Sequence, residues 1–249
     1  MLMAQQKNDT GGAQDLPKKT IADLFNDSPY RHFPHRQMIL YQGDKIDRIY
    51  YIISGYVRMY SITSKGNERT LAILGPGESV PLIQSEQAEY FYDCLTNVEA
   101  AYSSYEQIVD RFMNEGDYME AARAAGVKLM QRMIEQMDML ATDSAADKVE
   151  MALRFLARYY GEEHDGCSTL KFRVTHQELG NLVNLTRETV SNLVQKLEKK
   201  KIIKFNAGGY ISVFDSLEDK QPEVKDKKLR DKFNAGIRLG TTSDSEVTA

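Results

Sequence analysis

Cysteine, proline and tryptophan are scarce or absent in this chain. Among 249 residues there are two cysteines, six prolines and no tryptophan. Cys94 and Cys167 are too few for a disulfide framework, and they cannot supply the four thiolates of an iron–sulfur cluster. We therefore expect free thiols in a reducing compartment.

Long apolar runs are missing as well. No segment approaches the roughly 20 apolar residues that a membrane-spanning helix needs, and the N-terminal residues MLMAQQKNDTGG lack the apolar core of a signal peptide. A composition of 42% hydrophobic and 27% charged residues is typical of soluble, folded proteins. The sequence predicts a cytoplasmic protein of two modest domains, without a membrane partner.

A net positive charge is found in one segment of an otherwise acidic chain. Residues 171–204 contain eight basic and three acidic side chains, a net charge of +5, although the whole chain carries −4. Residues 1–170 carry −8. A local basic surface on an acidic protein favours a polyanionic partner for that segment alone.

Short β-rich runs separated by glycine turns fill residues 38–105. They read MILYQGD, IYYIISGYVRMYSI, TLAILGPGE and CLTNVEAAYSSY. Such runs predict an antiparallel sandwich or jelly roll, which we place at residues 21–110, after a flexible segment at residues 1–20. The cluster of Tyr90, Phe91 and Tyr92 either lines an effector pocket or packs this domain, and packing is favoured. Cys94 is expected to be a small buried residue.

Helical periodicity replaces the β pattern after Ile108, and we expect a long dimerisation helix over residues 111–143. One apolar stripe of this helix, formed by Leu129, Met133 and Leu140, is expected to face the β domain. The alternative is a buried helix in a monomer. The coiled-coil seam that predicts a homodimer recurs every three or four residues, at Val127, Met130, Ile134, Met137 and Ala141.

A break after this helix predicts a hinge at Asp143 and Ser144, either of which can cap the following helix. The C-terminal domain described next is placed at residues 144–214, and residues 215–249 are expected to be a disordered tail.

Residues 174–203 carry the most informative pattern. Thr175 with Glu178 forms a capping box that opens a short helix. Asn184 tolerates the left-handed conformation of a tight turn, and Thr186 can cap the next helix. Two short helices joined by such a turn predict a helix-turn-helix.

The second helix of this pair has a polar, basic face. Residues 199–214 then predict two strands around an Asn-Ala-Gly-Gly turn, a β-hairpin wing. The alternative is a helical domain with a solvated charged face. The exposed face is expected to present Arg187, Glu188, Ser191, Asn192 and Lys196.

The sequence resembles the CRP/FNR family of bacterial transcription regulators over about residues 30–214. The resemblance is carried by ILYQGDKIDRIYYIISGYVRMY with SKGNERTLAILGPGE, and by THQELGNLVNLTRETVSNLVQKLEKKKII. It implies an α+β protein with an N-terminal β-roll, a cyclic-nucleotide-binding-like jelly roll, a long dimer helix and a C-terminal winged helix-turn-helix. Double-stranded DNA and a second copy of the chain are the implied partners.

The same resemblance implies roles for single residues. Arg187 would donate to a guanine and Glu188 would accept from a cytosine amino group, with Ser191 and Asn192 completing the base-reading set. Asn192 stands where some members carry another base-reading arginine, so the family's usual half-site does not transfer whole. Residues expected to contact phosphates are Thr175, His176, Thr186, Thr189 and Lys196.

The β domain departs from the cyclic-AMP-binding members of the family. Ala88-Glu89 stands where an Arg-Ser pair would hold the cyclic phosphate, after Gly77-Glu78, and a carboxylate there repels that phosphate. We expect no cyclic AMP binding, no metal and no cofactor, and an unidentified small-molecule effector at most. Residues 161–169, GEEHDGCST, are expected to form an exposed loop between the domains, and the family resemblance implies that this loop contacts RNA polymerase.

The sequence therefore predicts a transcription regulator and not an enzyme. The alternative from another class is a cupin-like small-molecule-binding protein or metal-dependent enzyme. A cupin metal site needs clustered histidine and carboxylate ligands, and residues 38–105 contain no histidine.

Overall fold

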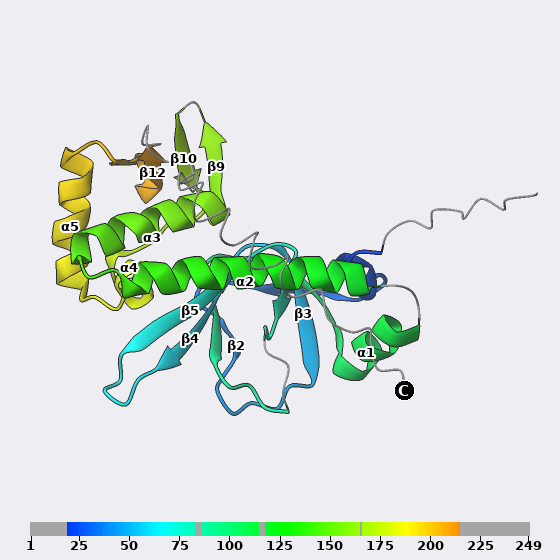
Figure 1. Cartoon of the computed structure of the whole chain (residues 1–249). Helices are drawn as coiled ribbons and strands as arrows, with labels where there is room; N and C mark the ends of the chain where they lie inside the picture. Colours follow the sequence, from blue (N-terminus) through cyan, green and yellow to red (C-terminus); the bar gives the residue numbers. More distant parts are fainter. Residues whose placement is uncertain (1–18, 83–85, 115–117, 165, 215–249) are drawn as a thin grey trace, which may run out of the picture.

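The N-terminal half is a sandwich of two four-stranded sheets. The computed structural model describes residues 19–82, 86–114, 118–164 and 166–214 (Figure 1). One sheet has the order β1-β8-β3-β6 and the other β2-β7-β4-β5, with antiparallel pairing throughout. The strands span Tyr30–Phe33 (β1), Met38–Leu40 (β2), Arg48–Ser54 (β3), Val57–Ile62 (β4), Glu68–Leu74 (β5), Ser79–Val80 (β6), Phe91–Cys94 (β7) and Val98–Ser104 (β8).

Alternation along the strands builds the core of this β-roll. In β7 the side chains of Tyr92 and Cys94 are buried, and Phe91 stacks on Tyr60 with ring centroids 5.2 Å apart. The Tyr92 hydroxyl donates to the sulfur of Met59. The expected packing role of this aromatic cluster is confirmed, as is the burial of Cys94.

The helix predicted over residues 111–143 is two helices. A short 3-10 turn, η1 (Ile21–Phe25), precedes the β-roll, and α1 (Tyr105–Asn114) packs against it with Ile108 buried. The long helix is α2 (Met119–Ala141). Gly116 and Asp117 follow α1 in the sequence, and such residues often interrupt a helix. The prediction of one helix gave more weight to the apolar periodicity.

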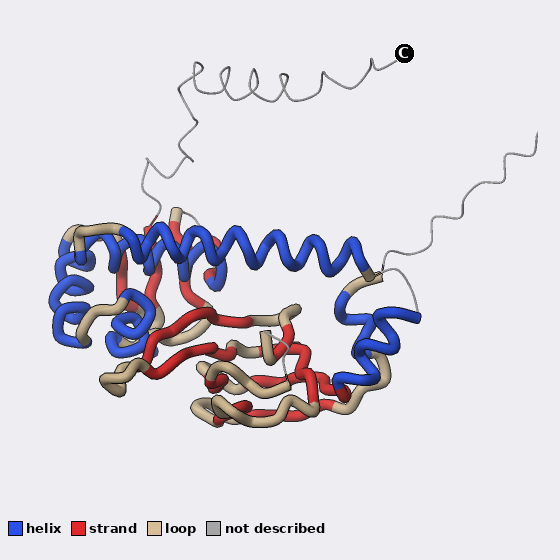
Figure 2. The backbone as a smooth tube through the Cα atoms, turned by 60° about the horizontal axis from the view of Figure 1, so that its bottom comes forward, coloured by secondary structure: helices blue, strands red, loops and turns tan. Residues whose placement is uncertain are grey.

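In Figures 1 and 2, α2 lies along the β-roll and continues to the second domain. Its inward face carries Gln136 and Met139, which are buried, and Arg132, which bonds Glu78 of the roll. The expectation that Met133 faces the roll is wrong, because this side chain is 42% exposed. Leu129 and Leu140 are half-buried. Polar side chains face the roll because β-strand carbonyls and Glu78 give them hydrogen-bond partners there.

The C-terminal half is a winged helix. It contains α3 (Ala145–Tyr160), α4 (His176–Val183) and α5 (Arg187–Lys199), and a sheet of order β11-β12-β10-β9. Its strands are β9 (Gly161–His164), β10 (Cys167–Leu170), β11 (Ile203–Phe205) and β12 (Ile211–Phe214), with the 3-10 turn η2 (Ala207–Gly209). The predicted wing is confirmed as the antiparallel pair β11–β12.

The loop expected at residues 161–169 is instead the β9–β10 hairpin. Cys167 pairs with His164, and Leu170 pairs with Gly161. The alternation of buried and half-buried residues in β10 shows that its side chains pack on the winged-helix core. Glu162, Glu163 and His164 of β9 are exposed. The N-terminal segment and the C-terminal tail predicted at residues 1–20 and 215–249 lie outside the described residues, except for residues 19 and 20.

Candidate nucleic-acid interface

Two capped helices build the candidate interface. The Thr175 hydroxyl accepts from Glu178 N at 3.1 Å, and Glu178 Oε2 accepts from Thr175 N at 2.7 Å, so the predicted capping box opens α4. Thr186 caps α5 by accepting from Thr189 N at 3.2 Å. Both helix starts are therefore fixed by side chains close in sequence.

The turn between α4 and α5 depends on two residues. Asn184 adopts the predicted left-handed conformation, with φ 57° and ψ 41°. Gly180 lies against the turn, and a Cβ atom there would be 2.6 Å from the carbonyl oxygen of Leu185. Sequence reasoning missed Gly180, although a glycine inside a helical pattern is a signal of close packing.

α5 places an exposed polar face opposite an apolar one. Val190, Val194 and Leu197 are buried in the winged-helix core. The four residues predicted to read bases come together on one side of α5, where Arg187, Glu188 and Asn192 are exposed and Ser191 is half-buried.

The residues predicted to contact phosphates come from both helices. Thr175 and Thr186 are exposed at the two helix starts, and Lys196 is exposed in the last turn of α5. His176 and Thr189 are half-buried. Backbone N–H groups at helix N-termini suit phosphate oxygens, so the positions are chemically appropriate for the predicted role.

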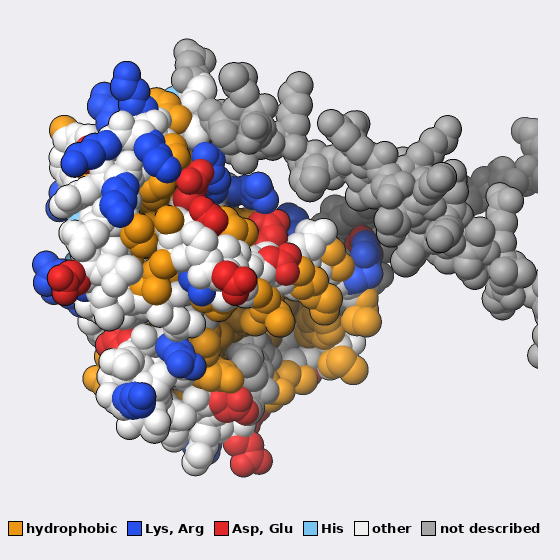
Figure 3. Space-filling model, turned by 60° about the vertical axis from the view of Figure 1, so that its left-hand side comes forward, with side chains coloured by type: hydrophobic (Ala, Val, Ile, Leu, Met, Phe, Trp, Pro, Cys, Tyr) orange, Lys and Arg blue, Asp and Glu red, His pale blue; other side chains and the backbone are white. Residues whose placement is uncertain are grey.

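Further basic side chains extend this surface. Figure 3 shows Lys and Arg side chains (blue) gathered over the upper part of the molecule, at the height of the winged helix in Figure 1. The Arg173 guanidinium lies 5.7 Å from the ring centroid of Tyr210 beside the wing. The exposed basic residues of this domain beyond the predicted set include Lys171, Arg173, Lys199, Lys200, Lys201 and Lys204.

The predicted dimer residues lie on α2, away from the winged helix surface. Val127, Met130, Ile134 and Met137 are between 46% and 68% exposed, and Ala141 is exposed as well. Met133 extends the same apolar stripe. The predicted hinge residues Asp143 and Ser144 lie in the connection between α2 and α3, where the Ser144 hydroxyl accepts from Asp147 N.

At the positions that drew attention in the sequence, the β-roll has an ion pair with α2. Glu78 accepts from Arg132 Nη2 at 2.5 Å and from Gly75 N at 2.8 Å. Ala88 is buried, whereas Glu89 is exposed. Burial, and then the neighbouring Asp93 carboxylate, raise the pKa of Cys94 to about 12.

Two features are absent from the described residues. No group of three or more His, Cys, Asp or Glu side chains is arranged to hold a metal ion there. None of the helices placed by the structure is long and apolar enough to cross a membrane.

A β-roll, a long connecting helix and a winged helix-turn-helix together form the architecture of one class of DNA-binding transcription regulators. Residues 30–115 match the family model of the cyclic nucleotide-binding domain, and residues 151–217 match that of the Crp-like helix-turn-helix domain. The two matches together span more than half of the chain. The chain belongs to the CRP/FNR family of transcription regulators. The family assignment replaces the cupin-like alternative.

Similar proteins support the same assignment over most of the chain. The cyclic AMP receptor protein of Thermus thermophilus is 29% identical over 184 residues, which are 72% of this chain and 81% of that protein. The CRP-like protein Clp of Xanthomonas euvesicatoria is 29% identical over 192 residues, 74% of this chain and 83% of Clp. The structure of the c-di-GMP-responsive regulator CLP of Xanthomonas campestris is similar with a TM-score of 0.63 and 26% identity, covering 79% of this chain and 99% of that one.

Proposed function

We propose that this regulator binds a near-palindromic DNA operator as a homodimer, with α5 of each protomer in the major groove. The observation that carries the proposal is the exposed polar face of α5, held by the Thr175 and Thr186 caps above a buried apolar face. Arg187 and Glu188 have the hydrogen-bonding groups to read guanine and cytosine, and Asn192 those to read adenine.

The dimer supplies the geometry of two-site recognition. We infer that the α2 stripes of two protomers pack together, because an apolar stripe of several exposed methionines on one helix is an expected contact surface. Two recognition helices are then expected about 34 Å apart, one turn of DNA. The connection at Asp143 and Ser144 is the proposed hinge that sets this separation.

The β-roll, residues 21–110, is proposed as the sensor domain, and residues 144–214 as the DNA-binding domain. We infer that cyclic AMP is not its effector. Glu78 is already paired with Arg132, and the exposed Glu89 is the residue that the family resemblance aligns with the phosphate-binding position. The β9–β10 hairpin, with its exposed Glu162 and Glu163, is the proposed contact with RNA polymerase.

Selection from a pool of random DNA duplexes tests the central proposal. The purified full-length chain is expected to enrich a motif with two related half-sites about ten base pairs apart, centre to centre. Enrichment of no motif over random competitor, with and without a small-molecule extract of cells, contradicts sequence-specific binding.

A further inference from the structure

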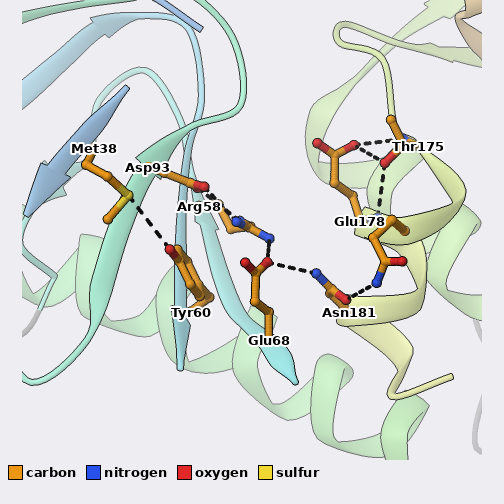
Figure 4. Close-up of polar contacts among 9 residues, drawn as sticks. Met38, Arg58, Tyr60, Glu68, Asp93, Thr175, Glu178 and Asn181 are labelled. Carbon is orange, nitrogen blue, oxygen red and sulfur yellow. Dashed lines mark hydrogen bonds and ion pairs between the residues drawn. The ribbon is translucent and has the colours of Figure 1, made fainter. Parts of the chain in front are cut away.

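A chain of hydrogen bonds joins the β-roll to the first helix of the helix-turn-helix (Figure 4). Asp93 in β7 accepts from Arg58 Nε at 2.9 Å and from Arg58 Nη2 at 2.6 Å. Arg58 Nη1 donates to Glu68 Oε2 at 2.7 Å, and Asn181 Nδ2 in α4 donates to the same oxygen at 3.0 Å. Asn181 Oδ1 in turn accepts from Gln177 Nε2 at 2.8 Å. One carboxylate oxygen of the roll thus binds a donor from each domain.

The residues on both sides of Glu68 are held in place. The Arg58 side chain is 9% exposed and its guanidinium lies 4.2 Å from the ring centroid of Tyr60. Burial lowers the pKa of Arg58, but Asp93 and Glu68 outweigh it and raise this pKa above its usual value. Arg58 therefore stays charged and fixes the Glu68 carboxylate.

Asn181 depends on this carboxylate. The residue is 8% exposed, so its amide group has little access to water. A buried amide that loses its partner costs more than an exposed one, because water cannot replace the hydrogen bond. Figure 4 shows Asn181 pointing from α4 toward Glu68. The contact therefore favours one placement of α4 on the roll.

Uncharged contacts also join the β-roll to the winged helix. The rings of Tyr56 and Phe172 lie 4.7 Å apart, centroid to centroid, and burial of apolar surface has little directional preference. The Tyr160 hydroxyl donates to the Ile73 carbonyl at 2.7 Å. The charged hydrogen bond between Glu68 and Asn181 adds a further directional restraint against rotation of the winged helix on the roll.

We propose that Glu68 is a positioning residue that, through Asn181, fixes the orientation of the winged helix-turn-helix on the β-roll. The inference rests on the proposed function, since the orientation matters to DNA only if α5 binds it. The docked arrangement leaves Arg187, Glu188 and Asn192 exposed. Glu68 therefore holds α5 ready for the duplex, and its loss weakens operator binding.

A reciprocal swap tests this role. Asn181→Asp sets two carboxylates against each other and breaks the contact. Adding Glu68→Gln removes this repulsion. Because Arg58 and Asn181 bind the same Glu68 oxygen, the new amide group must turn so that its oxygen accepts from Arg58 while its nitrogen donates to the carboxylate at position 181. The double variant keeps the net charge of the natural chain. It also keeps the carboxylate at position 181, so recovery cannot come from removing a negative charge near DNA.

The first readout is the distance between domains without DNA. Nitroxide labels are attached at two exposed positions, Lys45→Cys and Lys199→Cys, in a Cys167→Ser background. Pulsed electron paramagnetic resonance measures the distance between the two labels, in samples diluted with unlabelled chain. Cys94 is 1% exposed and stays unlabelled. Asn181→Asp is expected to broaden the distance distribution and the double variant to narrow it again. An unchanged distribution in Asn181→Asp overturns the proposal.

The second readout is operator affinity of the unlabelled variants, with circular dichroism to confirm that each is folded. Asn181→Asp is expected to weaken binding by about tenfold, the effect of one charged hydrogen bond, and the double variant to recover it. Equal or tighter binding by Asn181→Asp overturns the positioning role. Distances that respond as expected in a chain that binds no operator overturn the proposed function and leave the role of Glu68 in orientation standing.

Discussion

Single residues have two kinds of role at the candidate interface: some fix the backbone of the helix-turn-helix, and others are proposed to recognise DNA. Gly180 belongs to the first kind, because a side chain there meets the backbone of the turn that joins α4 to α5. Arg187 belongs to the second, since its exposed guanidinium presents paired donors. A substitution at one of these residues is expected to change stability, and at the other to change DNA selectivity.

Gly180→Ala is expected to lower the free energy of unfolding by about 1–3 kcal/mol, because the added methyl group lies too close to the Leu185 carbonyl and the turn must shift. Urea unfolding followed by circular dichroism measures the loss. Gln195→Ala, at an exposed position of α5, is the control and should stay within about 0.5 kcal/mol. Equal stabilities of the two variants would show that the turn accommodates a side chain.

Arg187→Ala is expected to cost about 1–3 kcal/mol on the selected operator and to relax the base preference at one position of each half-site. Lys196→Ala is the matched comparison, since the same helix loses one exposed cation that is assigned to phosphate. It should weaken binding to all duplexes alike and reduce the salt dependence by about one counterion. Binding titrations on the operator and on point variants of it separate the two patterns. Unchanged selectivity in Arg187→Ala would contradict base reading.

At the scale of secondary-structure elements, α2 has two different surfaces. Its inward face meets the roll through Arg132 and Gln136, and Met139 packs in the core that joins the winged helix to Ile73. Its outer face exposes a methionine-rich apolar stripe. Arg132 and Gln136 find acceptors in Glu78 and the Thr70 carbonyl, which explains why polar residues occupy the inner side. The apolar stripe is left for a partner.

Met137→Glu is expected to dissociate the dimer, with the dissociation constant rising by at least about tenfold, because a charge would be buried without a partner in the proposed interface. The Met137 side chain is 68% exposed in a single chain, so the fold of each protomer should survive. Analytical ultracentrifugation gives the association state. Lys128→Gln makes the same change in net charge at an exposed position away from the stripe and should leave the dimer intact. A stable Met137→Glu dimer would place the interface elsewhere.

At the scale of the whole molecule, the two domains form a docked unit with an acidic N-terminal part and a basic winged helix. The pair Glu78–Arg132 ties the roll to α2, and the Glu68–Asn181 contact ties it to α4. Both contacts begin at carboxylates of the roll that have their partners inside the chain.

Cyclic AMP is expected to leave operator affinity unchanged, because Glu78 is already bound by Arg132 and the Glu89 carboxylate repels a phosphate. Isothermal titration calorimetry of the full chain measures whether cyclic AMP binds. Operator titrations at saturating nucleotide measure whether it changes the affinity for DNA. Heat of binding at micromolar nucleotide, or tighter operator binding in its presence, would show that the roll is a cyclic AMP sensor.

Much of the fold was predictable because its signals are local. The Thr175 and Thr186 caps, the left-handed Asn184 and the wing turn each depend on residues a few positions apart, and each forms as predicted. The predictions that failed had different causes. The exposure of Met133 depends on which side of α2 meets the roll, which no local signal gives. The hairpin at residues 161–169 and the break before α2 did have local signals in the sequence, Asp165-Gly166 and Gly116-Asp117, which the prediction did not use.

The sequence by itself determined the alternating strands of the roll, the two capped helices and the polar face of α5, because each follows from side-chain period and capping within one element. Only the tertiary structure decided that Arg132 meets Glu78, that Gly180 packs against the turn, and that Glu68 meets Asn181. Glu68 and Asn181 are 113 positions apart. No periodicity specifies such a pair, since it exists only where two independently patterned surfaces come together.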